Sequence, residues 1–255
     1  MSALEHVLER TVLIRAKRET VFRYFTESDR FAAWWGEGST IDARPGGALR
    51  IRYPNGVLAS GEVVEVVPPS RVVFTYGYED PAKPVRPGGS RVVVTLDERK
   101  DGTFLRLRHE LPDAAARDAH VQGWRYQLAV FANVVTGETS AGLRQAVDAF
   151  LAAWSEKDEA RRRAALAAVA TEDMTFADAF SCTAGIEDLV VHLAAAQVHM
   201  PGVVLERTGE VRQCQGTAVV EWAAKGPDGA PRGRGTNVFD LAPDGRIARV
   251  IGFWG

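Results

Sequence analysis

The chain has 255 residues, with 31 lysine and arginine residues against 33 aspartate and glutamate residues and a net charge of −2. A nucleic-acid-binding protein usually shows a basic surface in its composition, so this balance argues against nucleic acid as a partner. The length favours two domains of ordinary size over a single large one.

The first 18 residues do not resemble a secretory signal, because acidic side chains occur early and no uninterrupted apolar core follows. No segment approaches the roughly 18 consecutive apolar residues of a membrane-spanning helix. The two cysteines, Cys182 and Cys214, are typical of buried thiols in a reducing compartment. We therefore expect a cytoplasmic protein with no membrane partner, and the abundance of alanine and arginine suggests a bacterial source.

The first half of the chain reads as a strand, a short helix and a meander of strands. Period-2 alternation predicts a strand at 5–16, and Thr20 is the candidate N-cap of the helix after it. Three large rings, Phe31, Trp34 and Trp35, then lie close together and need a core or a pocket. Further strands are expected at 39–43, 48–54, 57–69, 71–79, 90–99 and 102–111.

Two dipeptides predict tight hairpins between these strands. Asn55-Gly56 and Asp101-Gly102 are typical of type I′ turns, in which both central residues have positive φ. The strands are therefore expected to pair as an antiparallel meander.

A long helix at 113–135 follows the meander. Its apolar residues recur at steps of three and four and form one stripe that a sheet must cover: Val121, Trp124, Leu128, Phe131 and Val135. Gly123 lies in the middle of the helix, where glycine costs roughly 1 kcal/mol relative to alanine. Such a glycine usually marks a close approach by backbone or ligand. We expect a sheet curled around this helix, with a cavity between them.

A set of spaced motifs carries a family resemblance for this half. The motifs are TVF (20–22), AWW (33–35), PGG (45–47), SGEVVEVVPPSRVVFTY (60–76), DGTFLRLRHE (101–110) and HVQGWRYQL (120–128). Together they resemble the START-like helix-grip (SRPBCC) superfamily, in the branch named after the activator of the heat-shock-protein ATPase. The resemblance implies a deep pocket for apolar ligands between sheet and long helix, with Trp34, Trp35, Tyr76 and Trp124 as wall residues.

Two histidines, His109 and His120, flank the turn into the long helix. A partly exposed surface position is the favoured interpretation for both. His120 is the better candidate for a ligand contact, because its helix faces the sheet, and Gly123 lies one turn away on the same helix.

The pattern restarts after a polar segment of small residues, GETSAG at 137–142, which predicts a linker. Helices are expected at 143–158, 159–170 and 185–200, with a strand at 174–177 between the second and third. Four strands are expected to finish the chain, at 203–213, 217–226, 234–243 and 246–255. The predicted domains are therefore 1–138 and 142–255.

Helices followed by a long antiparallel meander are the order of the cone-shaped nuclear transport factor two-like (NTF2-like) fold. Five segments of this half resemble its SnoaL-like, polyketide-cyclase branch: AWSEKD, TEDMTFADAFSCTAG, VHMPG, GPDGAP and PDGRIARVIGFWG. This branch includes cyclases, isomerases and dehydratases. The resemblance also implies that this domain pairs with a second copy of itself. The expected fold class is α+β, a helix-grip domain followed by an α+β cone.

Five polar residues of the second half are candidates to project into the cone: Asp178, His199, Glu221, Asn237 and Asp240. Period-2 alternation favours solvent-facing positions for Glu221 and Asp240. If the protein is an enzyme, Asp178 is its predicted acid or base and His199 the nearest candidate partner. Burial among aromatic rings would raise the pKa of Asp178 toward neutrality, whereas hydrogen bonds from loop amides would lower it.

The histidine, cysteine and carboxylate spacings match no metal site, and neither a phosphate-binding glycine loop nor a GxSxG elbow occurs. We expect no metal and no cofactor. The favoured function is binding of a small hydrophobic or aromatic molecule, and whether any reaction is catalysed stays open. The competing hypothesis is a cyclase, isomerase or dehydratase acting on a polyketide-like or steroid-like substrate in the cone. A chaperone ATPase activator is a remote third alternative.

Overall fold

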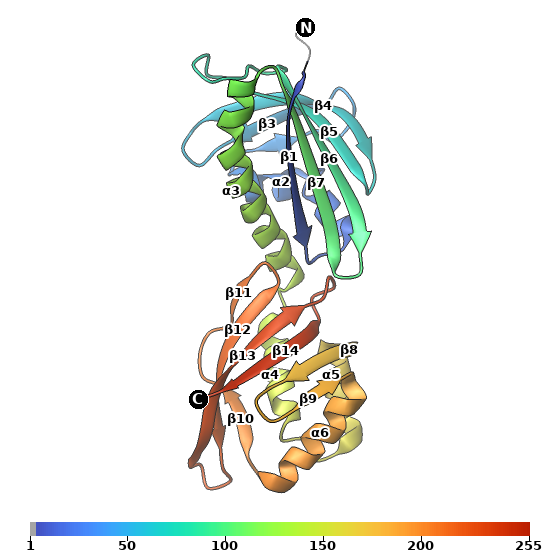
Figure 1. Ribbon diagram of the computed structural model, residues 1–255, viewed down its shortest axis with the longest axis vertical. Coiled ribbons are helices and arrows are strands. Elements are labelled where there is room, and N and C mark those ends of the chain that lie inside the picture. Colours follow the sequence, from blue (N-terminus) through green and yellow to red (C-terminus); the bar gives the residue numbers. More distant parts are fainter. Residues whose placement is uncertain (1–3) are drawn as a thin grey trace. The chain divides into compact units, whose positions relative to one another are not determined.

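The computed structural model describes residues 4–255, which form two compact units. The first unit extends to Val135, and the second comprises Thr136–Gly255. Each unit packs helices on a sheet of its own around a separate core (Figure 1). The α+β fold class and the two-domain architecture predicted from the sequence are confirmed.

The first unit is a meander of seven strands with two short helices and one long helix. Its elements are β1 (His6–Ile14), α1 (Arg18–Arg23), α2 (Ser28–Trp35), β2 (Thr40–Ile41), β3 (Ala48–Arg52), β4 (Leu58–Val67), β5 (Arg71–Tyr78), β6 (Ser90–Arg99), β7 (Gly102–Leu111) and α3 (Ala114–Thr139). The strand order is β1-β7-β6-β5-β4-β3-β2, and every neighbouring pair is antiparallel. Figure 1 shows α3 running lengthwise along this sheet.

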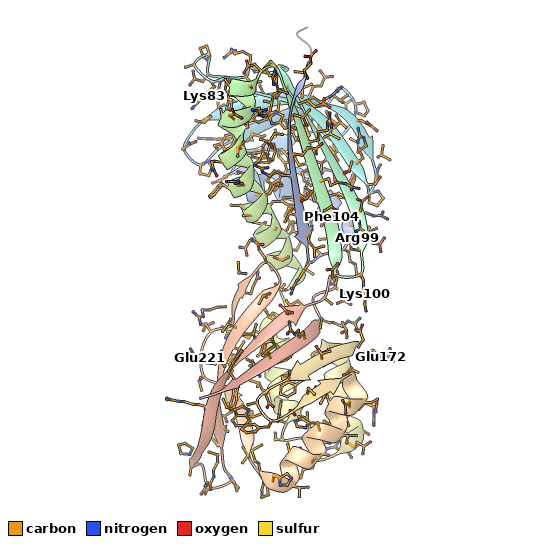
Figure 2. The ribbon with its side chains drawn as sticks, in the orientation of Figure 1. Lys83, Arg99, Lys100, Phe104, Glu172 and Glu221 are labelled. Carbon is orange, nitrogen blue, oxygen red and sulfur yellow. The ribbon has the colours of Figure 1, made fainter. Side chains whose placement is uncertain are left out.

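The apolar stripe predicted on the long helix is the face that α3 buries. Trp124, Leu128, Phe131 and Val135 are each at most 5% exposed and belong to the core of this unit. The other side of the core comes from alternate residues of the strands, since successive side chains of a strand point to opposite faces. Phe104 lies on the outward face of the sheet, opposite the exposed Leu13 of β1. The guanidinium groups of Arg99 and Arg106 lie over its ring at 5.7 Å, and Figure 2 shows Phe104 beside Arg99.

Two helices of this unit do not begin or end where the sequence predicts. The helix after β1 begins earlier than expected, so its N-cap is Lys17 and not Thr20, and no side chain caps it. The long helix continues to Thr139, through the first half of the predicted linker. At the end of this helix the carbonyl oxygen of Thr136 accepts both the amide of Ser140 at 3.0 Å and the hydroxyl of Ser140 at 2.7 Å.

The predicted hairpins form, but not with type I′ turns. Gly56 and Gly102 have positive φ, whereas Gln215 is the sole non-glycine residue with positive φ in the described part of the chain. Between β3 and β4 the amide of Gly56 donates to the carbonyl oxygen of Tyr53 at 2.9 Å. Pro54 fixes a negative φ at the first central position, so the turn has the type I shape followed by a left-handed glycine.

The second unit combines three helices with a seven-stranded sheet. Its elements are α4 (Leu143–Ala153), α5 (Glu159–Val169), β8 (Ala170–Ala177), β9 (Cys182–Ala184), α6 (Ile186–His199), β10 (Val204–Arg207), β11 (Arg212–Cys214), β12 (Thr217–Lys225), β13 (Pro231–Leu241) and β14 (Ile247–Trp254). The order is β10-β12-β13-β14-β8-β9, with β11 also on β12. The pair β14 and β8 is parallel, and the other pairs are antiparallel.

Two features of this unit were not expected from the sequence. The short strand β9 pairs with β8, and it places Cys182 at the surface. Cys214 is also exposed, so the expectation of two buried thiols is wrong.

No helix in residues 4–255 has the length and apolar character needed to cross a membrane.

Candidate ligand cavity of the first domain

The first unit contains a cavity of about 480 Å³ between the sheet, α2 and α3. Its lining residues are Ala33, Trp34, Trp35, Gly36, Tyr53, Pro54, Asn55, Tyr76, Tyr78, Ala119, His120, Gly123, Trp124, Tyr126, Gln127 and Val130. Small-molecule pockets of proteins typically measure about 300 to 1,000 Å³. The cavity therefore has the size of a ligand site.

The six residues predicted to contact a ligand, Trp34, Trp35, Tyr76, His120, Gly123 and Trp124, all lie in this lining. Sequence reasoning missed Tyr53, Tyr78 and Gln127, which line the same space. A signal for Tyr78 was available, because it lies two residues after Tyr76 on one strand and so faces the same side. Gln127 lies one helical turn after Gly123, and its amide nitrogen donates to the carbonyl oxygen of Trp34.

Gly123 has open space where a side chain would begin. A Cβ atom placed on this residue would meet no heavy atom within 4 Å. A close approach of another backbone segment is therefore not the reason for a glycine in the middle of α3. Because Gly123 lines the cavity, any larger residue here would project into it.

Aromatic packing fixes the α2 wall of the cavity. The rings of Trp34 and Trp35 lie 4.3 Å apart, and Trp34 also meets Phe131 of α3 edge-on at 4.7 Å. The indole nitrogen of Trp34 donates to the carbonyl oxygen of Tyr24 at 3.1 Å. Such edge-on aromatic pairs add about 0.5–1.5 kcal/mol beyond area burial, so the wall is largely pre-formed.

The opposite strands contribute a pair of hydrogen-bonded phenols. The hydroxyl oxygens of Tyr53 and Tyr76 lie 2.7 Å apart. Burial raises the pKa of both phenols far above its usual value, and the nearby Tyr78 raises it further. Both groups are therefore neutral and act as hydrogen-bonding groups without charge.

His109 is fully buried behind the cavity wall, which corrects the expectation of a surface histidine. The indole nitrogen of Trp124 donates to Nδ1 of His109 at 2.9 Å. Nε2 lies 2.8 Å from the hydroxyl oxygen of Ser90, which itself donates to the carbonyl oxygen of Tyr76 at 2.8 Å. Ser90 has only one proton, so Nε2 of His109 must be the donor in that contact. Burial, together with the imidazole of His120, lowers the pKa of His109 to about 3.

His120 is also buried, at 5% exposure, so the surface interpretation is wrong for this residue as well. Its Nδ1 lies 2.7 Å from the carbonyl oxygen of Ala116, one turn back on α3. The ring of Tyr78 stacks on the imidazole at 5.7 Å, and Tyr76 and His109 meet it edge-on. Burial lowers the pKa of His120, so its ring is neutral at pH 7.

The second unit offers a different kind of site. Oδ1 of Asp178 accepts hydrogen bonds from the amides of Phe180 and Ser181, both at 2.8 Å, and from the hydroxyl of Ser181 at 2.9 Å. Oδ2 accepts from the indole nitrogen of Trp254 at 3.0 Å. Burial raises the pKa of Asp178, but these donors outweigh burial and the pKa lies below its ordinary value. Of the two alternatives for Asp178, this is the one in which loop amides cap the carboxylate, and not the raised pKa required of a catalytic acid or base.

The predicted partner of Asp178 also differs from the observed one. His199 is exposed in the last turn of α6. The imidazole near Asp178 is instead His192, whose Nε2 lies 3.2 Å from the hydroxyl oxygen of Ser181. Since that hydroxyl donates to Asp178, His192 can only donate to Ser181. A catalytic triad needs the reverse, a serine that donates to histidine, so Ser181 is not an activated nucleophile.

The interior of the cone is filled by its own side chains. Two small pockets are lined by Trp254, one of them also by Asp178, and each has a volume of about 10 Å³. Such a space is at most the size of one water molecule. Trp154, Trp222 and Trp254 occupy the interior, with Gly235 giving room to the ring of Trp222.

The remaining polar candidates of the cone serve local structure. Asn237 is buried and accepts a hydrogen bond from the indole of Trp222 at 2.9 Å. Asp240 accepts from the hydroxyl of Thr217 at 2.7 Å. Glu221 is exposed and points away from the interior (Figure 2). Across residues 4–255, no three histidine, cysteine, aspartate or glutamate side chains gather in a way that could hold a metal ion.

Comparison with known protein families divides the chain into the same two halves. Residues 15–136 match the family described as activator of Hsp90 ATPase homolog 1-like protein, and residues 147–250 match the SnoaL-like domain. The chain therefore joins an activator-of-Hsp90-ATPase-homolog-like domain to a SnoaL-like domain. Both resemblances drawn from the sequence motifs are confirmed. No curated protein matches the sequence.

Solved structures resemble one half of the chain at a time. A SnoaL-like family protein from Agrobacterium tumefaciens strain C58 is 27% identical, with 46% of this chain and 98% of that chain covered and a TM-score of 0.42. A protein from Chromobacterium violaceum is 26% identical, with 49% and 94% covered and a TM-score of 0.42. The Aha1 dimer from Colwellia psychrerythraea is 19% identical, with 48% and 90% covered and a TM-score of 0.42.

Proposed function

We propose that the protein binds a small apolar or aromatic molecule in the cavity of its first domain, and that binding, as in carriage or sensing, is its function. The observation that carries this proposal is the cavity of about 480 Å³ lined by tryptophan and tyrosine rings. Aromatic walls with a few polar groups are typical of small-molecule sites. The buried contacts among these rings support a site that exists before the ligand arrives.

The competing hypothesis, catalysis in the cone, has less support. A pocket of about 10 Å³ cannot hold a polyketide-like or steroid-like substrate without large movement of the tryptophan rings. Asp178 is held ionised by several donors, which makes it a weak base near pH 7. We therefore place ligand binding in the first domain. For the second domain we propose self-association, which the exposed rings of Phe180 and Phe253 support.

The glycine of α3 provides the test of the cavity. Gly123→Leu should fill space between α3 and the sheet and abolish binding of an aromatic fluorescent dye by the full chain. The same change should stabilise α3 by somewhat under about 1 kcal/mol, because leucine is the better helix former. Dye affinity is measured by fluorescence titration, and stability by thermal unfolding.

Gly137→Leu is the matched control. Gly137 lies on the same helix but outside the cavity lining, and a Cβ atom there would meet only the amide of Gln213, at 3.6 Å. This variant should bind the dye as the wild type does. Unchanged dye affinity in Gly123→Leu would overturn the proposal that ligands occupy this cavity.

A further inference from the structure

The side chain of His120 presents a buried hydrogen-bond acceptor that no protein group uses. Its Nδ1 lies 2.7 Å from the carbonyl oxygen of Ala116, and a carbonyl can only accept. Nδ1 is therefore the protonated nitrogen. In a neutral imidazole Nε2 is then a bare acceptor, and Nε2 is buried without a hydrogen-bond partner within the described residues.

His120 carries this acceptor in the wall of the cavity. Nδ1 is held by the backbone of α3, so Nε2 lies at the far tip of the side chain, away from the helix. The tip lies among the rings of Tyr76 and Tyr78, which line the cavity together with His120. An unsatisfied buried polar group costs about 1–3 kcal/mol, and folded proteins retain few of them.

His109 shows that the acceptor on His120 is not a general feature of buried histidines in this domain. Both nitrogens of His109 have partners, since Trp124 donates to Nδ1 and Nε2 contacts Ser90. The two imidazoles lie 4.9 Å apart, and only His120 belongs to the lining of the cavity. His120 is therefore the one imidazole of the cavity wall, in the described part of the chain, that has a free acceptor.

The tryptophans of the cavity differ in the same way: the indole N–H groups of two have a hydrogen-bond acceptor, and that of the third has none. The indole nitrogen of Trp34 donates to Tyr24, and that of Trp124 donates to His109. The indole nitrogen of Trp35 is buried without a partner within the described residues. A ligand oxygen could accept from it. Among the histidine and tryptophan side chains that line the cavity, the unused groups are thus one acceptor on α3 and one donor on α2.

The lining also limits the charge of the ligand. None of the residues that line the cavity in the described part of the chain is aspartate, glutamate, lysine or arginine. A charged group buried without a partner of opposite charge is costly. A ligand of this cavity must therefore be uncharged, and it must donate a hydrogen bond to satisfy Nε2 of His120.

We propose that the ligand is an uncharged aromatic compound with a hydroxyl group that donates a hydrogen bond to Nε2 of His120. This inference rests on the proposed function and adds the chemical class of the ligand. The tyrosine and tryptophan rings contact its aromatic body. His120 contributes specificity, because an analogue without the hydroxyl proton leaves Nε2 unsatisfied.

Two probes, one with the hydroxyl proton and one with a methyl group in its place, test the inference on the full chain. Calorimetric titration at pH 7.5 compares 2-naphthol with 2-methoxynaphthalene, in which a methyl group replaces the proton. We expect 2-naphthol to bind about tenfold more tightly. His120→Phe keeps a ring of similar size without Nε2 and should bring the two affinities together. His199→Phe, at an exposed position of the second domain, should leave the preference unchanged.

A second measurement uses the wild-type protein, so it does not require that any variant folds. With nitrogen-15-labelled histidine, the Nε2 signal of His120 should shift when 2-naphthol is added and stay in place with 2-methoxynaphthalene. Equal affinity of the two probes for the wild type would overturn this inference and leave the proposed function standing. Absence of binding by both probes would overturn the proposed function and this inference with it.

Discussion

His109 couples the stability of the first domain to pH. Its pKa is about 3 in the folded protein, against an ordinary value of 6.5. Between these two values the unfolded chain binds a proton that the folded chain excludes. Stability is therefore complete above pH 6.5 and declines as the pH falls below it, by about 2 kcal/mol at pH 5. The physical cause is burial of an imidazole whose two nitrogens are already used by Trp124 and Ser90.

Urea unfolding of the full chain at pH 5 and pH 7.5, followed through NMR signals of β6 and β7 amides, measures this effect. His109→Gln should lower stability at both values but reduce the difference between them, because glutamine does not titrate. His192→Gln, in the second domain, is the control and should leave the difference in the first domain unchanged. A difference as large in His109→Gln as in the wild type would assign the pH dependence to other groups.

The burial of His109 had a signal in the sequence. His109 continues the inward alternation of Leu105, Leu107 and Leu111 on β7, and all four residues are buried. The general surface preference of histidine favours exposure, but the alternation of β7 decides the burial of His109. Its partners could not be predicted, because Ser90 and Trp124 reach it from other elements of the fold.

At the scale of elements, the sequence predicted most strands and helices because their periodicity is set by burial on one face. Strands β3 to β7 and helices α3 to α6 all lie within the predicted ranges or close to them. The strand β9 was missed because three residues are too short to show alternation. The parallel pairing of β8 with β14 was missed because it joins segments far apart in the chain.

The residues of the candidate sites divide in the same way, into those that local sequence patterns predict and those that depend on packing between distant segments. The wall residues of the first cavity came from the family motifs and the stripe of α3. The pairing at Asp178 depends on which turn of α6 faces the loop after β8. His192 and His199 lie on nearly the same side of the helix, so periodicity alone could not choose between them. Only the packing of α6 on β8 and β9 brings His192 to Ser181.

Helix α5 is tied to its neighbours by one buried arginine. The guanidinium of Arg162, which is 2% exposed, donates to the carbonyl oxygen of Glu156 at 2.7 and 3.0 Å and to that of Val190 at 3.1 Å. These bonds join α5 to the loop before it and to α6. Arg162→Met would remove these charged hydrogen bonds, whereas Gln197 would still donate to the carbonyl oxygen of Glu156 at 2.9 Å. Hydrogen bonds from charged groups are worth about 1.5–3 kcal/mol, so we expect a loss of about 3 kcal/mol in the stability of the second domain.

Arg163→Met is the matched control for this element. The neighbouring Arg163 is exposed and forms ion pairs with Glu159 and Glu187 on the surface. Exposed ion pairs contribute at most about 1 kcal/mol, so this variant should be nearly neutral. Urea unfolding followed through the tryptophans of the second domain distinguishes the two. Equal effects of both variants would mean that Arg162 does not anchor α5.

At the scale of the whole molecule, the two cores share no residue. The core of the first unit ends at Val135 and that of the second begins at Leu143. Each half therefore holds an apolar core of its own, and we predict that each half folds by itself when the chain is cut between α3 and α4. The cut after Ala141 keeps α3 with the Ser140 bond at its end, and Gly142 then remains as the N-cap of α4.

Fragments 1–141 and 142–255 test this prediction. Each should unfold cooperatively, with a melting temperature within about 8 °C of the matching transition in the full chain, which corresponds to roughly 1 kcal/mol. A third fragment, 136–255, adds the last turn of α3, whose Thr139 carbonyl lies against Gly245. This fragment should be slightly more stable than 142–255, since it restores that contact. A fragment that shows no cooperative transition would mean that the domains depend on each other for folding, and calorimetry of the full chain would then show a single transition.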